Sequence, residues 1–148
     1  MKISLKSKNI LDKIAKMNKT KKPKYIDHIV LIVKDVNKTK DFYSKFLGKP
    51  IIKDDVQVAY QIGETKLFFG LPYKEYKLGD KDEYSLNHLA FGVRSIKELK
   101  YFEKILNDNN IINKGMRLDK YGKREYVSFD DPDGYRIEFY HRPSTNKK

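Results

Sequence analysis

Residues 28–36 read His-Ile-Val-Leu-Ile-Val-Lys-Asp-Val, and residues 88–96 read His-Leu-Ala-Phe-Gly-Val-Arg-Ser-Ile. The two stretches align at an offset of 60 positions, with a histidine at the start of each and apolar residues at matching places. The ends of the two halves align at an offset of 70, where Leu-Phe-Phe at 67–69 falls on Ile-Glu-Phe at 137–139. This internal repeat indicates two copies of one supersecondary unit that share a core.

The patterns within each half predict one strand, then one helix, then three strands. Both helices carry an apolar stripe at helical spacing, and Gly48 follows the first where a left-handed residue ends a helix. Asp-Pro-Asp-Gly at 131–134 is typical of a turn and predicts a hairpin. The fold class is therefore predicted to be α+β, with paired βαβββ modules. We expect strands over 26–33, 49–54, 56–62, 65–70, 86–93, 111–118, 125–130 and 135–140, and helices over 36–47 and 96–109.

Length and composition predict one compact domain or two half-size modules around a common core. The chain has 148 residues, of which 39% are hydrophobic. No apolar run approaches the ~18 residues that indicate a membrane span. The absence of Cys excludes disulfides and thiolate chemistry and fits a reducing cytoplasm, where we expect the protein. We divide the chain into a basic extension at 1–24, a domain at 25–143 with modules at 25–72 and 84–143, and a mobile tail at 144–148.

The positive charge is concentrated in the extension. Residues 1–24 hold nine Lys and one acidic residue, so they contribute +8 of the net charge of +12. The simpler interpretation is that the many Lys, Asn and Ile residues reflect an AT-rich genome, and the alternative is nonspecific contact of the tail with anionic partners. Because the remaining chain is only mildly basic, we do not expect nucleic-acid binding. Apolar residues at helical spacing predict a short amphipathic helix over roughly 7–18: Ile10, Leu11, Ile14 and Met17.

Alternation along the strands indicates which residues share a cavity. Side chains of a strand point to opposite faces in turn. If the large apolar residues of the repeat pack under the helices, then His28, His88 and Glu138 face the other way, and the small Ala90 and Gly92 leave room beside His88. The same parity places six further candidates for substrate binding in the cavity: Arg136, Tyr126, Ser128, Tyr140, Phe68 and Gln61.

Two histidines and one glutamate in a common cavity predict a metal site. A single histidine at the start of a strand is more often a hydrogen-bonded core or edge residue than a ligand. A lone carboxylate in an apolar cavity carries a large desolvation penalty, which a metal ion held by the two imidazoles would remove. We therefore interpret His28, His88 and Glu138 as ligands of one divalent metal ion.

These motifs together resemble the vicinal oxygen chelate superfamily, which contains glyoxalase I, extradiol dioxygenases, fosfomycin-modifying enzymes and bleomycin-binding proteins. The resemblance spans about 25–140 and depends on the order of its pieces, since each alone is weak. The pieces are Ile-Asp-His-Ile-Val-Leu-Ile-Val at 26–33, Phe42-Tyr43 with Leu47-Gly48, Asn-His-Leu-Ala-Phe at 87–91 and Asp-Pro-Asp-Gly-Tyr-Arg-Ile-Glu-Phe at 131–139.

The resemblance implies modules whose curved mixed sheets surround a metal-binding cavity, commonly with dimerisation shaping that cavity. It assigns the metal ligands to His28, His88 and Glu138. Glyoxalase I uses a fourth ligand near the end of the first module, and the repeat places Phe68 there, which cannot bind metal. The resemblance thus implies an open two-His, one-Glu site for Fe, Mn, Zn or Ni, a small-molecule substrate with vicinal oxygens, and a homodimer.

Several reaction types remain open within that superfamily. We expect a divalent-metal-dependent enzyme of the glyoxalase or extradiol dioxygenase type. For a dioxygenase, alternation places His141 on the wrong face for proton transfer, and Ser128 stands where that family has a Tyr. Strict glyoxalase I activity is disfavoured, because Phe68 replaces the group that usually moves the proton, but a looser glyoxalase-like lyase or isomerase stays open.

A resistance protein is the alternative function. A fosfomycin thiol transferase shares the three ligands, and here the cluster of Arg117, Lys120, Lys123 and Arg124 would supply positive charge, although a solvated loop is the simpler explanation of the cluster. A bleomycin-type binding protein normally lacks the triad, so a binder here would be one that retains the metal. We expect Arg136 or Tyr126 to orient the substrate's oxygens.

Overall fold

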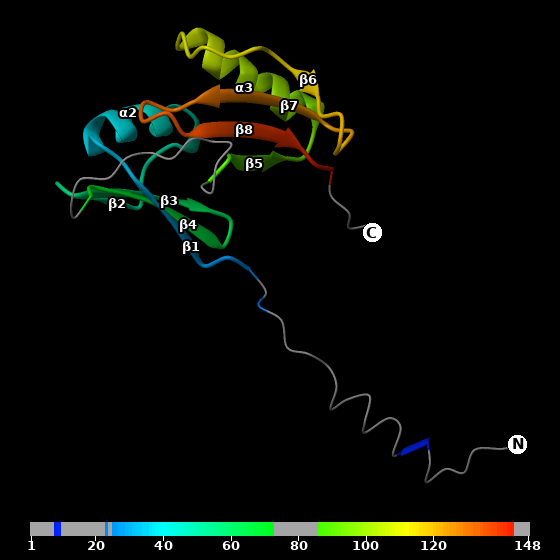
Figure 1. The fold of residues 1–148 in the computed structure, drawn as a ribbon, viewed down its shortest axis with the longest axis horizontal. Helices are drawn as coiled ribbons and strands as arrows, with labels where there is room; N and C mark the ends of the chain where they lie inside the picture. The colour runs from blue at the N-terminus through cyan, green and yellow to red at the C-terminus, as the bar shows by residue number, and fades with distance from the viewer. Residues whose placement is uncertain (1–7, 10–22, 24, 73–85, 144–148) are drawn as a thin grey trace, which may run out of the picture.

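The computed structural model describes residues 8–9, 23, 25–72 and 86–143. Within this part of the chain, the two halves form the same succession of strand, helix and three strands (Figure 1). The α+β fold with paired βαβββ modules is thereby confirmed. Of the amphipathic helix expected over roughly 7–18, the structure describes only residues 8–9, which are helical; the rest of that helix and the tail at 144–148 fall outside the described residues.

Both modules have the same sheet topology. The first sheet has the order β1-β4-β3-β2 and the second has the order β5-β8-β7-β6, with the outer pairs β1–β4 and β5–β8 parallel. The first module consists of β1 (His28–Ile32), α2 (Val36–Leu47), β2 (Ile52–Lys53), β3 (Gln57–Ile62) and β4 (Thr65–Gly70). The second consists of β5 (Leu89–Val93), α3 (Ile96–Asp108), β6 (Arg117–Leu118), β7 (Glu125–Asp130) and β8 (Arg136–His141).

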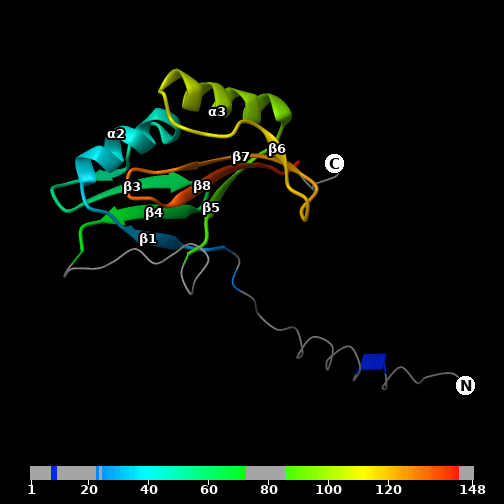
Figure 2. The ribbon, with the colours of Figure 1, turned by 45° about the horizontal axis from the view of Figure 1, so that its top comes forward.

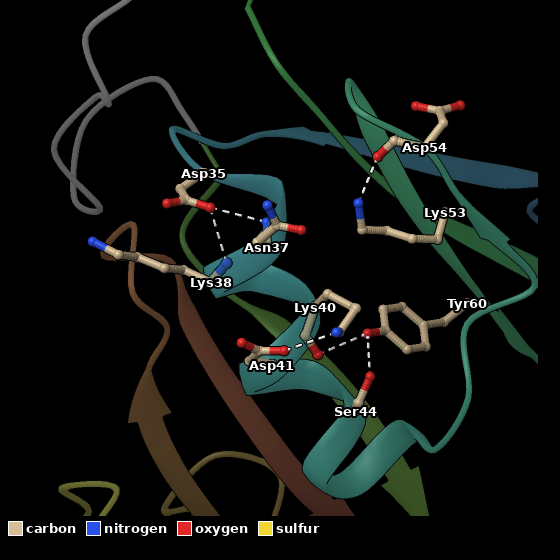
Figure 3. Close-up of polar contacts among 9 residues, drawn as sticks. All are labelled: Asp35, Asn37, Lys38, Lys40, Asp41, Ser44, Lys53, Asp54 and Tyr60. Atoms are coloured by element: carbon tan, nitrogen blue, oxygen red, sulfur yellow. Dashed lines mark hydrogen bonds and ion pairs between the residues drawn. The ribbon is translucent and has the colours of Figure 1, made fainter.

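Local side-chain caps determine where the helices begin. The Asp35 carboxylate accepts hydrogen bonds from the backbone N–H groups of Asn37 and Lys38 at 2.9 and 3.0 Å, which satisfies two free donors at the start of α2 (Figure 3). Ser95 accepts from the N–H of Glu98 at 3.1 Å at the start of α3. Gly48 follows α2 with a positive φ of 75°, which favours glycine, but its ψ of −148° lies outside the left-handed helical region that its sequence position predicts.

The main differences from the expected elements lie in three strands. The strand expected over 49–54 pairs only at β2, because Pro50 has no N–H to donate and Lys49 and Pro50 stand outside the ladder. The strand expected over 111–118 is reduced to β6 and a single bridge at Asn113, since Asn110 and Gly115 have positive φ values of 54° and 70° and bend the chain. The strand expected over 86–93 begins only at residue 89.

The two modules share one hydrophobic core. Both helices lie on the same side of the sheets (Figure 2). Phe46 of α2 reaches into the second module, where its ring meets that of Phe139 at 5.4 Å. Tyr43 packs on Phe69 at 4.2 Å, and Phe102 of α3 stacks on Phe139 at 4.4 Å. The helices therefore occupy one face of each sheet and leave the opposite face open for function.

Polar contacts also join the modules, at the turn formed by residues 131–134. The buried Tyr43 hydroxyl donates to Asp131 Oδ2 at 2.8 Å. The Tyr135 hydroxyl donates to the carbonyl of Ile32 at 3.0 Å, and the N–H of Lys34 donates to Asp133 Oδ1 at 2.9 Å. We call these three hydrogen bonds the inter-module clamp. They give the Asp-Pro-Asp-Gly motif a structural role beyond its hairpin.

Among the described residues, no helix is both long enough and apolar enough to cross a membrane.

Candidate metal centre

The strand register places the predicted ligands on the faces that the helices leave open. Glu138 of β8 lies between Ala90 of β5 and Ser128 of β7 in adjacent strands, so these three side chains share a face. His88 directly precedes β5 and belongs to the same alternating set as Ala90. In the first sheet, His28 is paired with Lys66 on the corresponding face. The expected orientation of all three candidate ligands therefore agrees with the register.

The structure brings His88 and Glu138 together. Nε2 of His88 lies 3.7 Å from Oε2 of Glu138, which is longer than a hydrogen bond. Two ligands that each bind one ion at ~2.0–2.2 Å lie ~3.0–3.8 Å apart at bond angles of ~90–120°. The Glu138 side chain is only 12% exposed, so its carboxylate is largely withdrawn from water. The spacing and chemistry of this pair fit two ligands of one divalent ion.

Each histidine is oriented by the residue that precedes it. Nδ1 of His28 lies 2.9 Å from Oδ2 of Asp27, and Nδ1 of His88 lies 2.7 Å from Oδ1 of Asn87. Carboxylate and amide oxygens accept hydrogen bonds, so in the neutral tautomer that fits these contacts Nδ1 would carry the proton and Nε2 would keep its lone pair for a metal ion. The hydrogen bond from His28 lowers the pKa of Asp27, which keeps this acceptor charged. Metal-binding histidines typically have such partners.

His28 stands apart from the other two residues within the chain. Its ring meets Phe68 edge-on at 5.9 Å, and its side chain is 55% exposed. Among the described residues, no group of three His, Cys, Asp or Glu side chains is close enough to hold an ion. The chain thus contains a pair of candidate ligands in one module and a single candidate in the other. The assignment of all three to one metal ion stays a prediction.

The residues predicted to bind substrate divide between the two modules. Ser128 and Tyr126 of β7 and Arg136 of β8 line a cavity of about 830 Å³ that also reaches Glu138. Tyr140 faces a second cavity, of about 550 Å³, that includes His88. Phe68 and Gln61 belong to the first sheet, on the face of His28. Their roles with substrate stay predictions.

A statistical model of one family matches residues 25–139, which is most of the chain. That match covers both modules, both histidines and the strand that carries Glu138. The chain belongs to the glyoxalase/bleomycin resistance protein/dioxygenase superfamily. The resemblance seen in the sequence is confirmed, and the paired modules are those of this superfamily.

Members of the superfamily with different activities are similar to the chain. It is 30% identical over 116 residues to the metallothiol transferase FosB of Staphylococcus saprophyticus, covering 78% of this chain and 75% of that protein. It is 28% identical over 121 residues to the lactoylglutathione lyase of Escherichia coli O157:H7, covering 75% and 87%. The crystal structure of the fosfomycin resistance protein FosX of Listeria monocytogenes has a TM-score of 0.62 at 22% identity, covering 82% and 95%, and shows the shared fold.

Sequence reasoning missed several polar residues of this superfamily site. Asp27 and Asn87 could have been found, because they occupy equivalent places in the repeat, each directly before a histidine. Arg117 lies in β6, within the strand expected over 111–118, and donates a hydrogen bond to Ser128 Oγ at 2.9 Å, a contact that the sequence did not predict. Asp119 also lies beside the open face, where it accepts a hydrogen bond from Tyr140. No short-range signal predicted that pairing.

Proposed function

We propose that the chain is a metal-dependent enzyme that activates an oxygen-bearing small molecule for reaction with a thiol. The observation that carries the proposal is the 3.7 Å spacing between His88 Nε2 and Glu138 Oε2 on an open sheet face. A bound divalent ion would act as a Lewis acid on the substrate's oxygens. Similarity to a metallothiol transferase and a lactoylglutathione lyase supports an enzyme of this class.

The neighbouring side chains favour substrate activation over isomerisation. In the second module, Glu138 is paired with Ala90 of the neighbouring strand. The equivalent pair in the first module is Phe68 with Val30, so an aromatic ring stands where a fourth carboxylate ligand would be. This supports a three-ligand set with open positions. Arg136 and Ser128 line the cavity next to Glu138, where a guanidinium and a hydroxyl would orient an oxygen-bearing substrate. Tyr126 borders the same cavity and would pack against the substrate's body.

The geometry gives no support to a dioxygenase. His141 is paired with Val93, on the face that the helices cover. Its Nδ1 lies 2.9 Å from Oε2 of Glu125, and this contact lowers the pKa of Glu125. Ser128 is the residue ten positions before Glu138 and offers only a hydroxyl. Neither residue would give a proton-transfer group of the dioxygenase type beside the metal.

We further propose that a second copy of the chain completes the metal site. The His28 side chain is 55% exposed and that of His88 is 43% exposed, so both imidazoles are open to a partner. Apolar side chains beside them are also exposed, including Val30 at 54% and Leu86 at 44%. In a two-fold symmetric dimer, each chain would give His28 to the other chain's His88–Glu138 pair, which produces two equal sites.

The proposed function predicts a specific pattern of activity. Protein purified without chelator is expected to contain about one transition metal ion per chain by elemental analysis. It is expected to consume a thiol such as L-cysteine in the presence of fosfomycin, and Glu138→Gln is expected to lower this rate by more than ~100-fold. Oxygen uptake with catechol, or turnover of the hemithioacetal of glutathione and methylglyoxal without any thiol transfer, would contradict the proposal.

The residues before the two histidines are expected to tune metal affinity. Asp27→Ala and Asn87→Ala should each weaken Zn²⁺ binding by ~10–100-fold, because the imidazoles lose the acceptors that orient them. Asp27→Asn should give an intermediate loss, since it keeps an acceptor oxygen but removes the charge. Competition titration against a chromogenic chelator measures these affinities. Asp41→Ala, an exposed acid on α2, is the control, and equal affinities in all four variants would refute the role.

A further inference from the structure

A second cavity on the open face extends from His88 along β5 and β8. It has a volume of about 550 Å³, and its floor is formed by the small residues Ala90 and Gly92. A Cβ atom at Gly92 would meet nothing within 4 Å, and Gly92 is not among the residues with positive φ. Neither backbone strain nor close packing therefore requires a glycine here. What its missing side chain provides is open space.

A short loop anchored on Tyr140 forms one wall of this cavity. Oδ2 of Asp119 accepts hydrogen bonds from the Tyr140 hydroxyl at 2.9 Å and from the Gly122 N–H at 3.0 Å. Oδ1 of Asp119 accepts from the Tyr121 N–H at 2.9 Å. These hydrogen bonds lower the pKa of Asp119 and keep it ionised. A side chain at Gly122 would collide with the Tyr140 hydroxyl, so the loop lies directly against β8.

The far end of the cavity carries a positive charge. Arg142 follows β8, is exposed, and places its guanidinium 5.6 Å from the centre of the Tyr140 ring. Within the described part of the chain, no ion pair joins this guanidinium to an acidic side chain. The Asp119 carboxylate, which lines the same cavity, accepts hydrogen bonds from the loop and from Tyr140. A cation held on an aromatic ring at a cavity wall is well placed to receive an anionic group.

The register gives the separation between the two ends. Tyr140 is paired with Gly92, four positions along the strand from His88. At ~3.3 Å per residue, the guanidinium over the Tyr140 ring therefore lies roughly 13 Å from the level of His88. This length and the small-residue floor fit an extended chain of atoms lying along β5.

We infer that this cavity is a subsite for an extended ligand whose far end is a carboxylate bound by Arg142. The inference rests on the proposed function, because the ligand's near end is the oxygen-bearing group at His88 and Glu138. Gly92 determines the width of the subsite, and Arg142 determines its preference for charge. Ligands that lack the terminal anion are expected to bind this subsite less tightly, and so are ligands that branch beside Gly92.

Linear hydroxamates of different chain lengths test the length of this subsite and its preference for a terminal anion. Hydroxamic acids present two neighbouring oxygens to a metal, and the probes carry a polymethylene chain that ends in either a carboxylate or its methyl ester. With the Zn²⁺-loaded chain, calorimetry is expected to show about tenfold tighter binding of the carboxylate than of the ester, with the largest ratio at a chain length of ~13 Å. Shorter chains are expected to show no preference.

Three variants and one control variant identify the residues responsible. Arg142→Ala is expected to abolish the carboxylate preference while leaving acetohydroxamate binding unchanged, and Arg142→Lys to restore part of it. Gly92→Val, which fills open space in a strand, is expected to weaken all long-chain probes. Lys100→Ala, which removes an equal charge from the exposed side of α3, is expected to change nothing. A carboxylate preference that survives Arg142→Ala, or one that is absent from the unmodified chain, overturns the inference.

Acetohydroxamate alone separates this inference from the function on which it rests. It is too short to reach Arg142 and reports only on the proposed metal centre. If it binds but the long carboxylate shows no advantage over its ester, the subsite is refuted and the metal centre stands. If acetohydroxamate and Zn²⁺ both fail to bind, the proposed function and the subsite are refuted together.

Discussion

A heterodimer of His28→Ala and Glu138→Ala chains is expected to bind metal at about one half of its sites, although neither homodimer binds any. In such a dimer, one site combines the two substituted residues, and the other combines the intact His28 of one chain with the intact His88–Glu138 pair of its partner. Co-expression with two different affinity tags and purification on both gives the heterodimer alone. Elemental analysis of metal per chain then measures the recovery.

The matched control pairs His88→Ala with Glu138→Ala. These two residues lie 3.7 Å apart in the same chain, so every site of that heterodimer lacks one ligand and recovery is expected to be absent. Equal recovery in both heterodimers would contradict a site shared in this way. If the His28→Ala homodimer kept its metal, His28 would not be a ligand. If the heterodimers bound none while the unmodified chain bound metal, the site would lie within one chain.

The fold could be predicted because its signal is repeated. Alternation places Leu89 and Phe91 under a helix, and the register with Ile137 and Phe139 agrees with that placement. The same pattern separates Glu138 from its apolar neighbours. Strand ends were less predictable. Apolar content alone suggested a strand over 111–118, whereas the positive φ of Asn110 and Gly115 depends on how the loop packs.

The sequence could predict which residues of each module face the candidate site, but not how the two modules are placed relative to each other. Alternation determines the face on which His28 and Glu138 lie, but it carries no information about the angle between two sheets. That angle depends on side chains such as Phe46, which packs against the second module, and on contacts such as Tyr43 with Asp131. A sequence repeat carries information about each module separately. It therefore could not predict that, in the described part of the chain, His88 lies near Glu138 while His28 does not.

Loss of the inter-module clamp is expected to destabilise the fold. Tyr43 is fully buried, and burial followed by the charge of Asp131 raises its pKa, so its hydroxyl stays protonated and donates. Tyr43→Phe leaves Asp131 Oδ2 without that donor and is expected to lower the free energy of unfolding by ~1–3 kcal/mol in urea titrations. The control is Tyr60→Phe, whose hydroxyl bonds Ser44 and the Lys40 carbonyl within one module (Figure 3). Its loss is expected to be smaller, because those part-buried groups can reach water.

Asp131 is also expected to make stability depend on pH. Burial raises the pKa of Asp131 above its ordinary value, although Tyr43 and two backbone N–H groups donate to its carboxylate and oppose the shift. A carboxyl whose folded pKa is raised binds its proton more tightly in the native state. Its contribution to stability is therefore complete below the unfolded pKa, near 3.8, and is lost as pH rises through the folded pKa.

Asp131→Asn removes this titration while keeping an oxygen for the two N–H donors. The free energy of unfolding of the unmodified chain, minus that of the variant, is expected to fall as pH rises from about 4 and then to level off above the folded pKa. Urea titrations of both proteins at matched pH values measure this difference, in which carboxyl groups elsewhere cancel. A difference that rises over the same interval would mean that the hydrogen bonds outweigh burial, and that the clamp is strongest when Asp131 is ionised.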